Sequence, residues 1–247
     1  MRLGVTGLLI EVRRLRVVLG DKIILRDINL RFEGPGLYFI LGPNGSGKST
    51  LLRAIAQLIE YEGLVLIEGR DAREFDRREL VRKLGYVWQN PFYGFFEATV
   101  EREIAFILKN IGEPVEKMWE LVSFFSAEDL LNRSPFTLSG GEAKRVCLLS
   151  VLVADQPMLL LDEPETELDL DGLNKLIHYL KKSFSSKLII VATPNTLLAY
   201  KLRRHIKKIF LISEGRIVAS GGSELLENQE LLRNVGIIPV GWWYEPS

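Results

Sequence analysis

The segment from Gly42 to Thr50 contains the residues whose types and spacing have the clearest chemical meaning. It reads Gly42-Pro43-Asn44-Gly45-Ser46-Gly47-Lys48-Ser49-Thr50 and satisfies the pattern GxxxxGK[ST], which cradles nucleotide phosphates. Its glycines leave room for backbone N–H groups to curl around an anion. Lys48 would supply a positive charge to the β- and γ-phosphates, and the Ser49 hydroxyl would bind Mg²⁺. The pattern therefore predicts that residues 44–50 bind ATP with Mg²⁺, and it disfavours the alternative of a glycine-rich turn without a ligand.

Two acids follow a second apolar run and could complete a triphosphate site. Asp162 and Glu163 come directly after Met158-Leu159-Leu160-Leu161. Asp162 would hold Mg²⁺ through water, and Glu163 is placed to polarise an attacking water. The alternative is two acids that cap a strand by chance, which the buried-strand pattern before them disfavours.

The elements that must position these residues alternate between strands and helices. Residues 10–18 and 23–32 indicate a hairpin, and residues 37–41 indicate a buried parallel strand before the phosphate loop. A helix is predicted over 49–60 by its apolar spacing, and the period is helical from about 99 to 154. Further strands are predicted at 64–67, 84–88, 159–161, 188–192 and 209–212, with a helix around 173–180. This alternation predicts an α/β fold with a parallel sheet.

Composition and charge exclude several other classes of protein. The 247 residues carry 32 Lys and Arg against 32 Asp and Glu, so no net charge points to nucleic acid. Cys147 is the single cysteine, which excludes an intrachain disulfide and a cysteine-built metal cluster. No apolar run approaches the ~20 residues of a membrane-spanning helix. The N-terminus lacks the pattern of a signal peptide, so we expect a cytoplasmic location.

A third motif, Leu138-Ser139-Gly140-Gly141-Glu142, opens a helical stretch, and Ser139 can cap that helix. Here the chain resembles the nucleotide-binding subunits of ABC transporters, whose signature is LSGGQ; only Glu142 differs. The motif order agrees, with the phosphate loop, Gln89 after a strand, the signature and the acidic strand in sequence. The resemblance implies a P-loop NTPase (RecA-like) core over 1–91 and 155–224 with an antiparallel β-subdomain. It also implies an inserted α-helical signature subdomain over 92–154 and a tail over 225–247.

The resemblance also implies partners and roles. In that family two ATPase subunits meet head to tail, so Ser139, Gly140 and Gly141 would close on the ATP held by the other subunit. Gln89 would contact Mg²⁺ or water and report the nucleotide to a transmembrane coupling subunit. Glu163 and Gln89 would thus be catalytic, and Ser49, Gln89 and Asp162 would bind the metal. A substrate-binding membrane subunit would be an indirect partner, and no nucleic acid is expected.

The segment from Gln89 to Val100 is similar to the energy-coupling factor (ECF) and cobalt-type importer ATPases. That subfamily imports vitamins or transition-metal ions, and the segment meets its transmembrane subunit. Phe92, Tyr93 and Gly94 depart from the acid, acid and Gln of the subfamily. An exposed aromatic cluster over 92–96 would suit a partner groove; burial of these aromatics in the core is the alternative left open.

Several further departures bear on catalysis. Pro194 stands where the family has a histidine that contacts the γ-phosphate, and proline has no side-chain donor. His205, eleven residues on, is a poor substitute, and Leu19 replaces an aromatic that stacks on adenine. Glu165 and Glu167 add charge to the DEPTxxLD segment, unless both are solvated loop acids. Trp242, Trp243 and Tyr244 in the tail are expected to pack against another part of the protein or a second ATPase subunit.

These observations favour an ATP-binding, energy-coupling subunit attached to the cytoplasmic face of the membrane, forming one half of an asymmetric ATPase heterodimer. The chain's own site would turn over slowly because of Pro194. A largely non-hydrolysing regulatory subunit and the ATPase of another ABC importer class remain alternatives. A soluble ABC ATPase of DNA repair or translation is disfavoured, because the chain has neither a long coiled-coil insertion nor two tandem cassettes.

Overall fold

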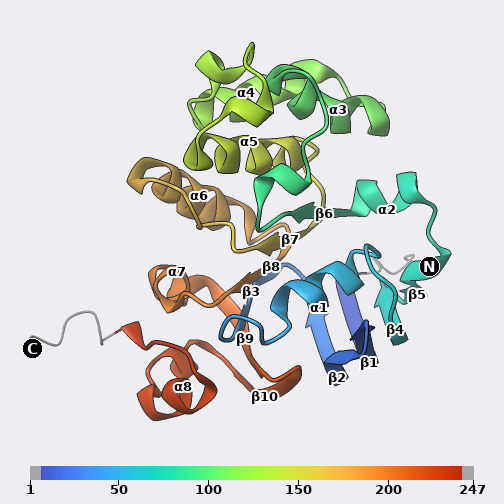
Figure 1. The fold of residues 1–247 in the computed structure, drawn as a ribbon, viewed down its shortest axis with the longest axis vertical. Coiled ribbons are helices and arrows are strands. Elements are labelled where there is room, and N and C mark those ends of the chain that lie inside the picture. Colours follow the sequence, from blue (N-terminus) through green and yellow to red (C-terminus); the bar gives the residue numbers. More distant parts are fainter. Residues whose placement is uncertain (1–6, 241–247) are drawn as a thin grey trace, which may run out of the picture.

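Two β-sheets form the centre of the molecule in the computed structural model, which describes residues 7–240 (Figure 1). The larger sheet has the order β10-β9-β3-β8-β7-β6 and is parallel except for β10, which pairs antiparallel with β9. Its strands are β3 (Gly36–Leu41), β6 (Leu84–Val87), β7 (Met158–Asp162), β8 (Leu188–Thr193), β9 (Ile206–Ser213) and β10 (Arg216–Gly221). The parallel strands confirm the predicted α/β class.

The smaller sheet is antiparallel and has the order β2-β1-β4-β5. Its strands are β1 (Leu9–Leu19), β2 (Lys22–Glu33), β4 (Glu62–Ile67) and β5 (Arg70–Asp71). The predicted hairpin is confirmed, because Leu19 pairs with Lys22 at its turn and Leu9 pairs with Glu33 at its far end.

Helix α1 (Lys48–Ile55) packs between the two sheets, and its buried residues belong to the same core as β1, β2 and β4. Strand β3 contributes side chains to the hydrophobic cores on both faces of the larger sheet. Tyr38 and Ile40 join the core under α1, whereas Leu37, Phe39 and Leu41 join the core on the opposite face. Alternation along a strand buried on both sides explains why this segment is apolar throughout.

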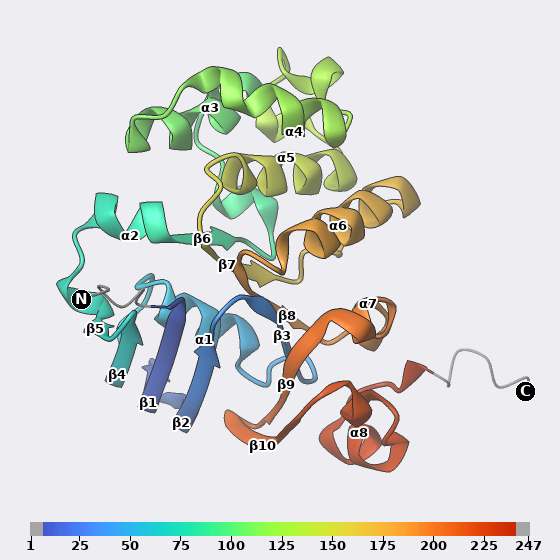
Figure 2. The same cartoon turned by 180° about the vertical axis from the view of Figure 1, so that it is seen from behind.

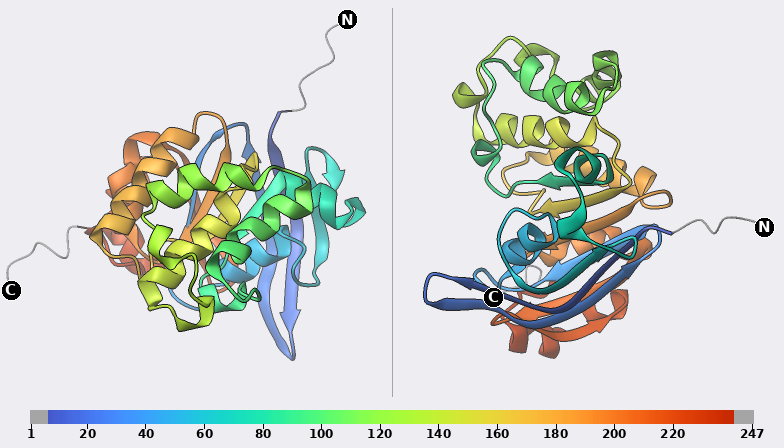
Figure 3. Two further views of the ribbon diagram at one scale, coloured as in Figure 1. Left: turned by 90° about the horizontal axis from the view of Figure 1, so that it is seen from above. Right: turned by 90° about the vertical axis from the view of Figure 1, so that its right-hand side faces the viewer.

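The remaining helices cover the opposite face of the larger sheet or extend from it (Figure 2). α3, α4 and α5 gather at one end of the molecule, beyond β6 and β7, and the two turned views agree on this placement (Figure 3). The helices are α2 (Arg77–Lys83), α3 (Val100–Ile111), α4 (Met118–Phe124), α5 (Gly140–Leu152), α6 (Leu170–Ser183), α7 (Thr196–Leu202) and α8 (Gln229–Val235).

The helix predicted over 49–60 is shorter than expected. α1 ends at Ile55, and Gln57 takes a left-handed conformation with φ 58°. The N–H groups of Gln57 and Leu58 donate to the carbonyls of Ala54 and Arg53, which closes the helix as a Schellman motif. The apolar spacing continued past this end because Leu58 and Ile59 follow in a loop.

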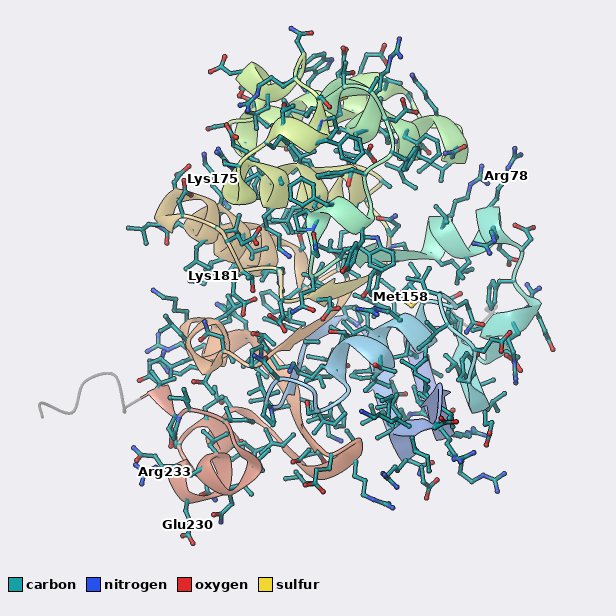
Figure 4. The ribbon with its side chains drawn as sticks, viewed as in Figure 1. Arg78, Met158, Lys175, Lys181, Glu230 and Arg233 are labelled. Carbon is teal, nitrogen blue, oxygen red and sulfur yellow. The ribbon has the colours of Figure 1, made fainter. Side chains whose placement is uncertain are left out.

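The charged side chains Arg78, Glu230 and Arg233 point outward, whereas Met158 lies in the interior (Figure 4). In the C-terminal part, Ile237 is buried in the main core and the Ile238 carbonyl accepts a hydrogen bond from Thr196 Oγ1 at 2.8 Å. The predicted contact of Trp242, Trp243 and Tyr244 lies outside the described residues. Within residues 7–240, no helix has the length and apolar character needed to span a membrane.

Candidate nucleotide-binding site

The loop between β3 and α1 has a backbone shape that requires glycine. Gly47 has φ 104°, and a Cβ there would lie 2.7 Å from Leu25 Cδ2. A Cβ on Gly42 would lie 2.3 Å from the carbonyl oxygen of Ile212. Gly47 is also the N-cap of α1, and because glycine has no side chain, no side-chain hydrogen bond caps that helix. The first turn of α1 also contains no acidic residue. The N-terminal N–H groups of α1 thus keep their capacity to bind an anion.

Two polar side chains of this loop are buried with donor capacity to spare. Lys48 Nζ donates to the carbonyls of Gly42 and Pro43, both at 2.9 Å, which leaves one of its three N–H groups for another acceptor. Burial lowers the pKa of Lys48, and the negative charge of Glu163 opposes that change. Ser46 Oγ is buried and has no hydrogen-bond partner among residues 7–240. Unused buried donors of this kind fit phosphate oxygens.

Asp162 is held at the end of β7 by two hydroxyl groups. Ser49 Oγ donates to its Oδ1 at 2.9 Å, and the Tyr86 hydroxyl donates to its Oδ2 at 3.0 Å. Burial raises the pKa of Asp162, while these two hydrogen bonds oppose the rise. A hydroxyl and a carboxylate side by side are the oxygen ligands that Mg²⁺ accepts when phosphates and water complete its shell. The part of the chain that is described contains no group of three or more His, Cys, Asp or Glu that could hold a metal.

A cavity of about 290 Å³ brings most of the predicted residues together. Its walls are Ile24, Asn44, Gly45, Gly47, Lys48, Ser49, Thr50, Gln89 and Glu163. A second cavity of about 520 Å³ shares Ile24 and Gly45 with it and continues along Ile23, Arg26 and the turn between β9 and β10. The two hollows thus meet over the phosphate loop.

Glu163 and Gln89 reach the cavity from loops at the ends of β7 and β6. Glu163 has φ 45°, and its N–H donates to the carbonyl of Ala192 in β8 at 2.8 Å. Gln89 follows β6, and its carbonyl accepts a hydrogen bond from Lys144 Nζ at 2.9 Å. Parallel strands place their C-terminal ends on one edge of a sheet, which explains why residues far apart in the chain meet here.

The signature residues Ser139, Gly140 and Gly141 stand at the start of α5 and do not line this cavity. Ser139 caps the helix as predicted, in a capping box that Glu142 completes. Glu142 accepts from the Ser139 N–H and hydroxyl at 2.8 and 2.9 Å, and Arg133 pairs with its other oxygen at 2.7 Å. Glutamate at this position thus serves the local helix start.

The loop acids that depart from the family pattern differ from each other. The interpretation of Glu165 as a solvated acid is wrong: its Oε1 accepts a hydrogen bond from Thr193 Oγ1, and its Oε2 is buried. Burial raises the pKa of Glu165 to about 6. Glu167 is exposed, and its carboxylate lies beside Gly140. Pro194 follows directly after β8, as the sequence placed it.

The aromatic segment after Gln89 is largely exposed. The exposed fractions of Phe92, Tyr93 and Phe96 are 39%, 69% and 56%, whereas Phe95 is buried. Phe96 packs edge-on against the half-exposed Phe106 of α3, with ring centroids 4.4 Å apart. These exposures contradict the alternative that the whole segment belongs to the core.

Sequence reasoning missed Tyr86 and Lys144. The strand predicted over 84–88 contains Tyr86 and the helical period from 99 to 154 contains Lys144, but neither prediction assigns the side chain a role. A tyrosine in a strand leading to a site and a lysine within an apolar helix face were the available signals, but neither pattern specifies a hydrogen-bond partner.

Comparisons with known proteins agree with this geometry. Residues 25–166 match the ABC transporter family. Among curated relatives, an ABC transporter ATP-binding protein of Archaeoglobus fulgidus is 39% identical over 87% of this chain and 90% of its own length. The energy-coupling factor transporter ATP-binding protein EcfA of Pediococcus pentosaceus is 31% identical over 88% and 79%.

Solved structures share the fold. The ATP-binding subunit of an ABC transporter superposes with a TM-score of 0.76 at 21% identity, over 93% of this chain and 94% of that one. CbiO1 of Clostridium perfringens, described as part of the ABC transporter complex cbiONQ, gives 0.71 at 26% identity, over 92% and 94%. The chain belongs to the ABC transporter family, as an ATP-binding domain.

Proposed function

We propose that this chain binds and hydrolyses ATP as the energy-coupling subunit of an ECF-type membrane importer. The observation that carries the proposal is the cavity in which Lys48, Ser49, Gln89 and Glu163 meet. Domains of this family bind ATP, usually with Mg²⁺, and are ATPases.

Each residue of the cavity has a role that follows from its chemistry. The nucleotide supplies the phosphoanhydride bond that is broken. Lys48, Ser46 and the N–H groups around Gly47 bind the phosphates, and Ser49 with Asp162 holds Mg²⁺. Glu163 orients the attacking water and accepts a hydrogen bond from it. Gln89 contacts Mg²⁺ or that water from the opposite loop.

The proposed assembly has three kinds of partner. A second ATPase subunit receives Ser139, Gly140 and Gly141 at its own nucleotide, which agrees with the exposure of Ser139 and with its absence from the walls of this chain's cavity. A transmembrane coupling subunit covers Phe92, Tyr93 and Phe96 at the cytoplasmic face of the membrane. A substrate-binding membrane subunit is reached through that coupling subunit.

The surface proposed for the transmembrane subunit is rigidly held. Glu103 of α3 is buried, and its Oε2 accepts the N–H groups of Phe96 and Glu97 at 3.0 and 2.9 Å. Aromatic side chains on a fixed backbone suit the centre of a protein interface. We further propose that residues 92–154 act as the helical subdomain, between core segments 1–91 and 155–224, and that 225–247 is the tail.

The importer class rests on the relatives named EcfA and CbiO1 and on the segment after Gln89. We propose that the cargo is a vitamin or a transition-metal ion. Pro194 favours an asymmetric heterodimer in which this chain's own site turns over slowly. The second candidate, a largely non-hydrolysing regulatory subunit, is favoured by the same residue.

Two measurements test the proposal. Lys48→Ala should abolish binding of a fluorescent ATP analogue, whereas Lys187→Ala, at a buried lysine that also donates to two carbonyls, should retain it. Unchanged affinity in Lys48→Ala would remove the phosphate loop from the proposal.

The second measurement uses the complex co-purified with a second ATPase subunit. Ser139→Arg should nearly eliminate its ATPase activity, and Glu163→Gln should change it little, because a missing transition-state hydrogen bond at Pro194 has already slowed this site ~100–1000-fold. If Glu163→Gln alone silences the complex, this chain's site is the working one.

A further inference from the structure

Two charged side chains that do not line the cavity are not used by the proposed mechanism. Lys144 of α5 is completely buried, and Glu165, two residues after the loop acid Glu163, is partly buried with its Oε2 enclosed. Burying a charged side chain is costly unless specific partners compensate it. Their partners therefore indicate what they do.

Lys144 joins the signature helix to the loop that carries Gln89. Its Nζ donates to the carbonyls of Trp88 and Gln89 at 3.0 and 2.9 Å. These two carbonyls belong to the residues that leave β6 and enter the cavity wall. A movement of α5 would therefore pull directly on the backbone of Gln89.

Glu165 joins the loop after β7 to the loop after β8. Its Oε1 accepts from Thr193 Oγ1, and that same hydroxyl oxygen accepts the N–H of Asn195 at 2.9 Å. Thr193 is fully buried and precedes Pro194. Glu165 thus links the loop that carries Glu163 to the strand end that precedes Pro194.

The two charges also act on each other. Burial lowers the pKa of Lys144, and the negative charge of Glu165 is among those that oppose this change. Burial raises the pKa of Glu165, and the positive charge of Lys144 opposes the rise. Each charge therefore makes the other less costly to bury.

We propose that Lys144 and Glu165 are positioning residues: Lys144 ties the loop of Gln89 to the signature helix, and Glu165 ties the loop of Glu163 to the strand end before Pro194. This inference rests on the proposed function for its catalytic consequence. The two residues hold these loops in the arrangement needed for hydrolysis, in the chain that has no donor at position 194. Neither side chain lines the cavity, so nucleotide binding itself depends on them little.

The test compares Lys144→Met with Lys187→Met. Methionine keeps the length of the side chain and removes its charge and donors. Lys187 is a matched control, because it is buried and donates to the carbonyls of Asp155 and Gln156 at 2.8 and 2.7 Å. It precedes β8 and therefore lies at the opposite end of that strand from Thr193.

In the complex that carries Ser139→Arg, where the remaining ATPase activity is that of this chain's own site, Lys144→Met should lower kcat at least ~10-fold and raise the Mg²⁺ concentration for half-maximal activity, with nucleotide affinity changed less than ~3-fold. Lys187→Met should lower thermal stability but leave both kinetic quantities within twofold. A Lys144→Met protein that folds and keeps both quantities overturns the inference. An activity loss that follows thermal stability equally in both variants also overturns it, because that shows a structural role.

A double-mutant cycle tests Glu165. Because the two residues hold different loops, Glu165→Gln should lower kcat further in the Lys144→Met background. A double variant that is no slower than Lys144→Met would overturn the positioning role of Glu165.

A readout on the nucleotide-free protein separates this inference from the proposed function. With Trp119, Trp242 and Trp243 replaced by Phe, Trp88 is the only tryptophan left of four. Acrylamide quenching of Trp88 should increase in Lys144→Met and not in Lys187→Met. Unchanged quenching overturns the positioning role even if ATP is hydrolysed. The proposed function is overturned if the wild-type protein binds no nucleotide. If Lys144→Met still increases quenching in that case, Lys144 remains a positioning residue of the loop alone.

Discussion

Replacing Glu165 by glutamine should stabilise the nucleotide-free protein at neutral and alkaline pH. Burial raises the pKa of Glu165 from its ordinary 4.5 to about 6, so the folded state binds this proton more tightly than the unfolded state. The stability from that proton is fully present below pH 4.5 and is lost as the pH rises through about 6. Above that range the folded protein holds a buried carboxylate, which glutamine would replace by a neutral amide that can still accept from Thr193.

The magnitude follows from the pKa. At about 1.4 kcal/mol per pH unit, a rise from 4.5 to about 6 corresponds to roughly 2 kcal/mol of unfolding free energy at pH 8. This is an upper value, because the Glu165 residue as a whole is only partly buried although its Oε2 is enclosed. At pH 5 the advantage of the variant should fall below ~1 kcal/mol.

The assay is urea unfolding of the nucleotide-free protein between pH 5 and pH 8. Glu167→Gln is the matched control, because Glu167 lies two residues away and is exposed. Its unfolding free energy should follow that of the wild type within ~0.5 kcal/mol at every pH. A Glu165→Gln protein that is less stable than the wild type at pH 8, or whose advantage does not shrink toward pH 5, would refute the reasoning.

Three further predictions concern other parts of the molecule. Tyr86→Phe removes a hydrogen bond that Asp162 accepts and should raise the pKa of Asp162 further, so that protons compete better with Mg²⁺. The Mg²⁺ concentration for half-maximal nucleotide binding should rise ~10-fold at pH 6 and less at pH 8, and it should not change in the control variant Tyr179→Phe. Tyr93→Asp should release the chain from its transmembrane subunit in pull-down experiments while ATP affinity stays unchanged, since Tyr93 is 69% exposed; unfolding of the variant would contradict this. Ile237→Ala should lower the unfolding free energy by ~2–4 kcal/mol, because Ile237 is 3% exposed in the main core, and an unchanged urea midpoint would contradict that packing.

Much of the fold could be predicted because hydrophobic periodicity is local. The hairpin and the buried strands β3, β7 and β8 follow from alternation or from short apolar runs bounded by turn residues. The end of a helix depends on backbone conformation, and the residue type of Gln57 does not predict its left-handed backbone conformation. β10 and α8 were missed because β10 lies at a sheet edge with half its residues exposed and α8 is only two turns long.

The residues proposed to contact the phosphates and Mg²⁺ could be predicted because they are neighbours in the sequence. Lys48 and Ser49 open α1 directly after the phosphate loop, and Asp162 and Glu163 lie at the end of one strand. Tyr86 could not be assigned, because its partner Asp162 is 76 residues away and their contact depends on the pairing of β6 with β7. Lys144 is a similar case, because its acceptors are backbone carbonyls, which every residue has, so the sequence does not identify them.

Glu165, a departure from the family pattern, is easier to understand together with Lys144 than alone. Within residues 7–240, Glu165 has one enclosed oxygen without a hydrogen-bond partner, and the buried Lys144 Nζ donates to two carbonyls. Each charge favours the charged form of the other, so each makes the other less costly to bury. Glu165 accepts from Thr193, the residue before Pro194, so its loop is anchored at that strand end. If position 194 makes no contact with the γ-phosphate, as we propose, the Glu165–Thr193 contact still fixes the backbone that leads into it. Restoring a histidine at 194 without changing Glu165 would therefore place the ring on a loop already held by a different contact.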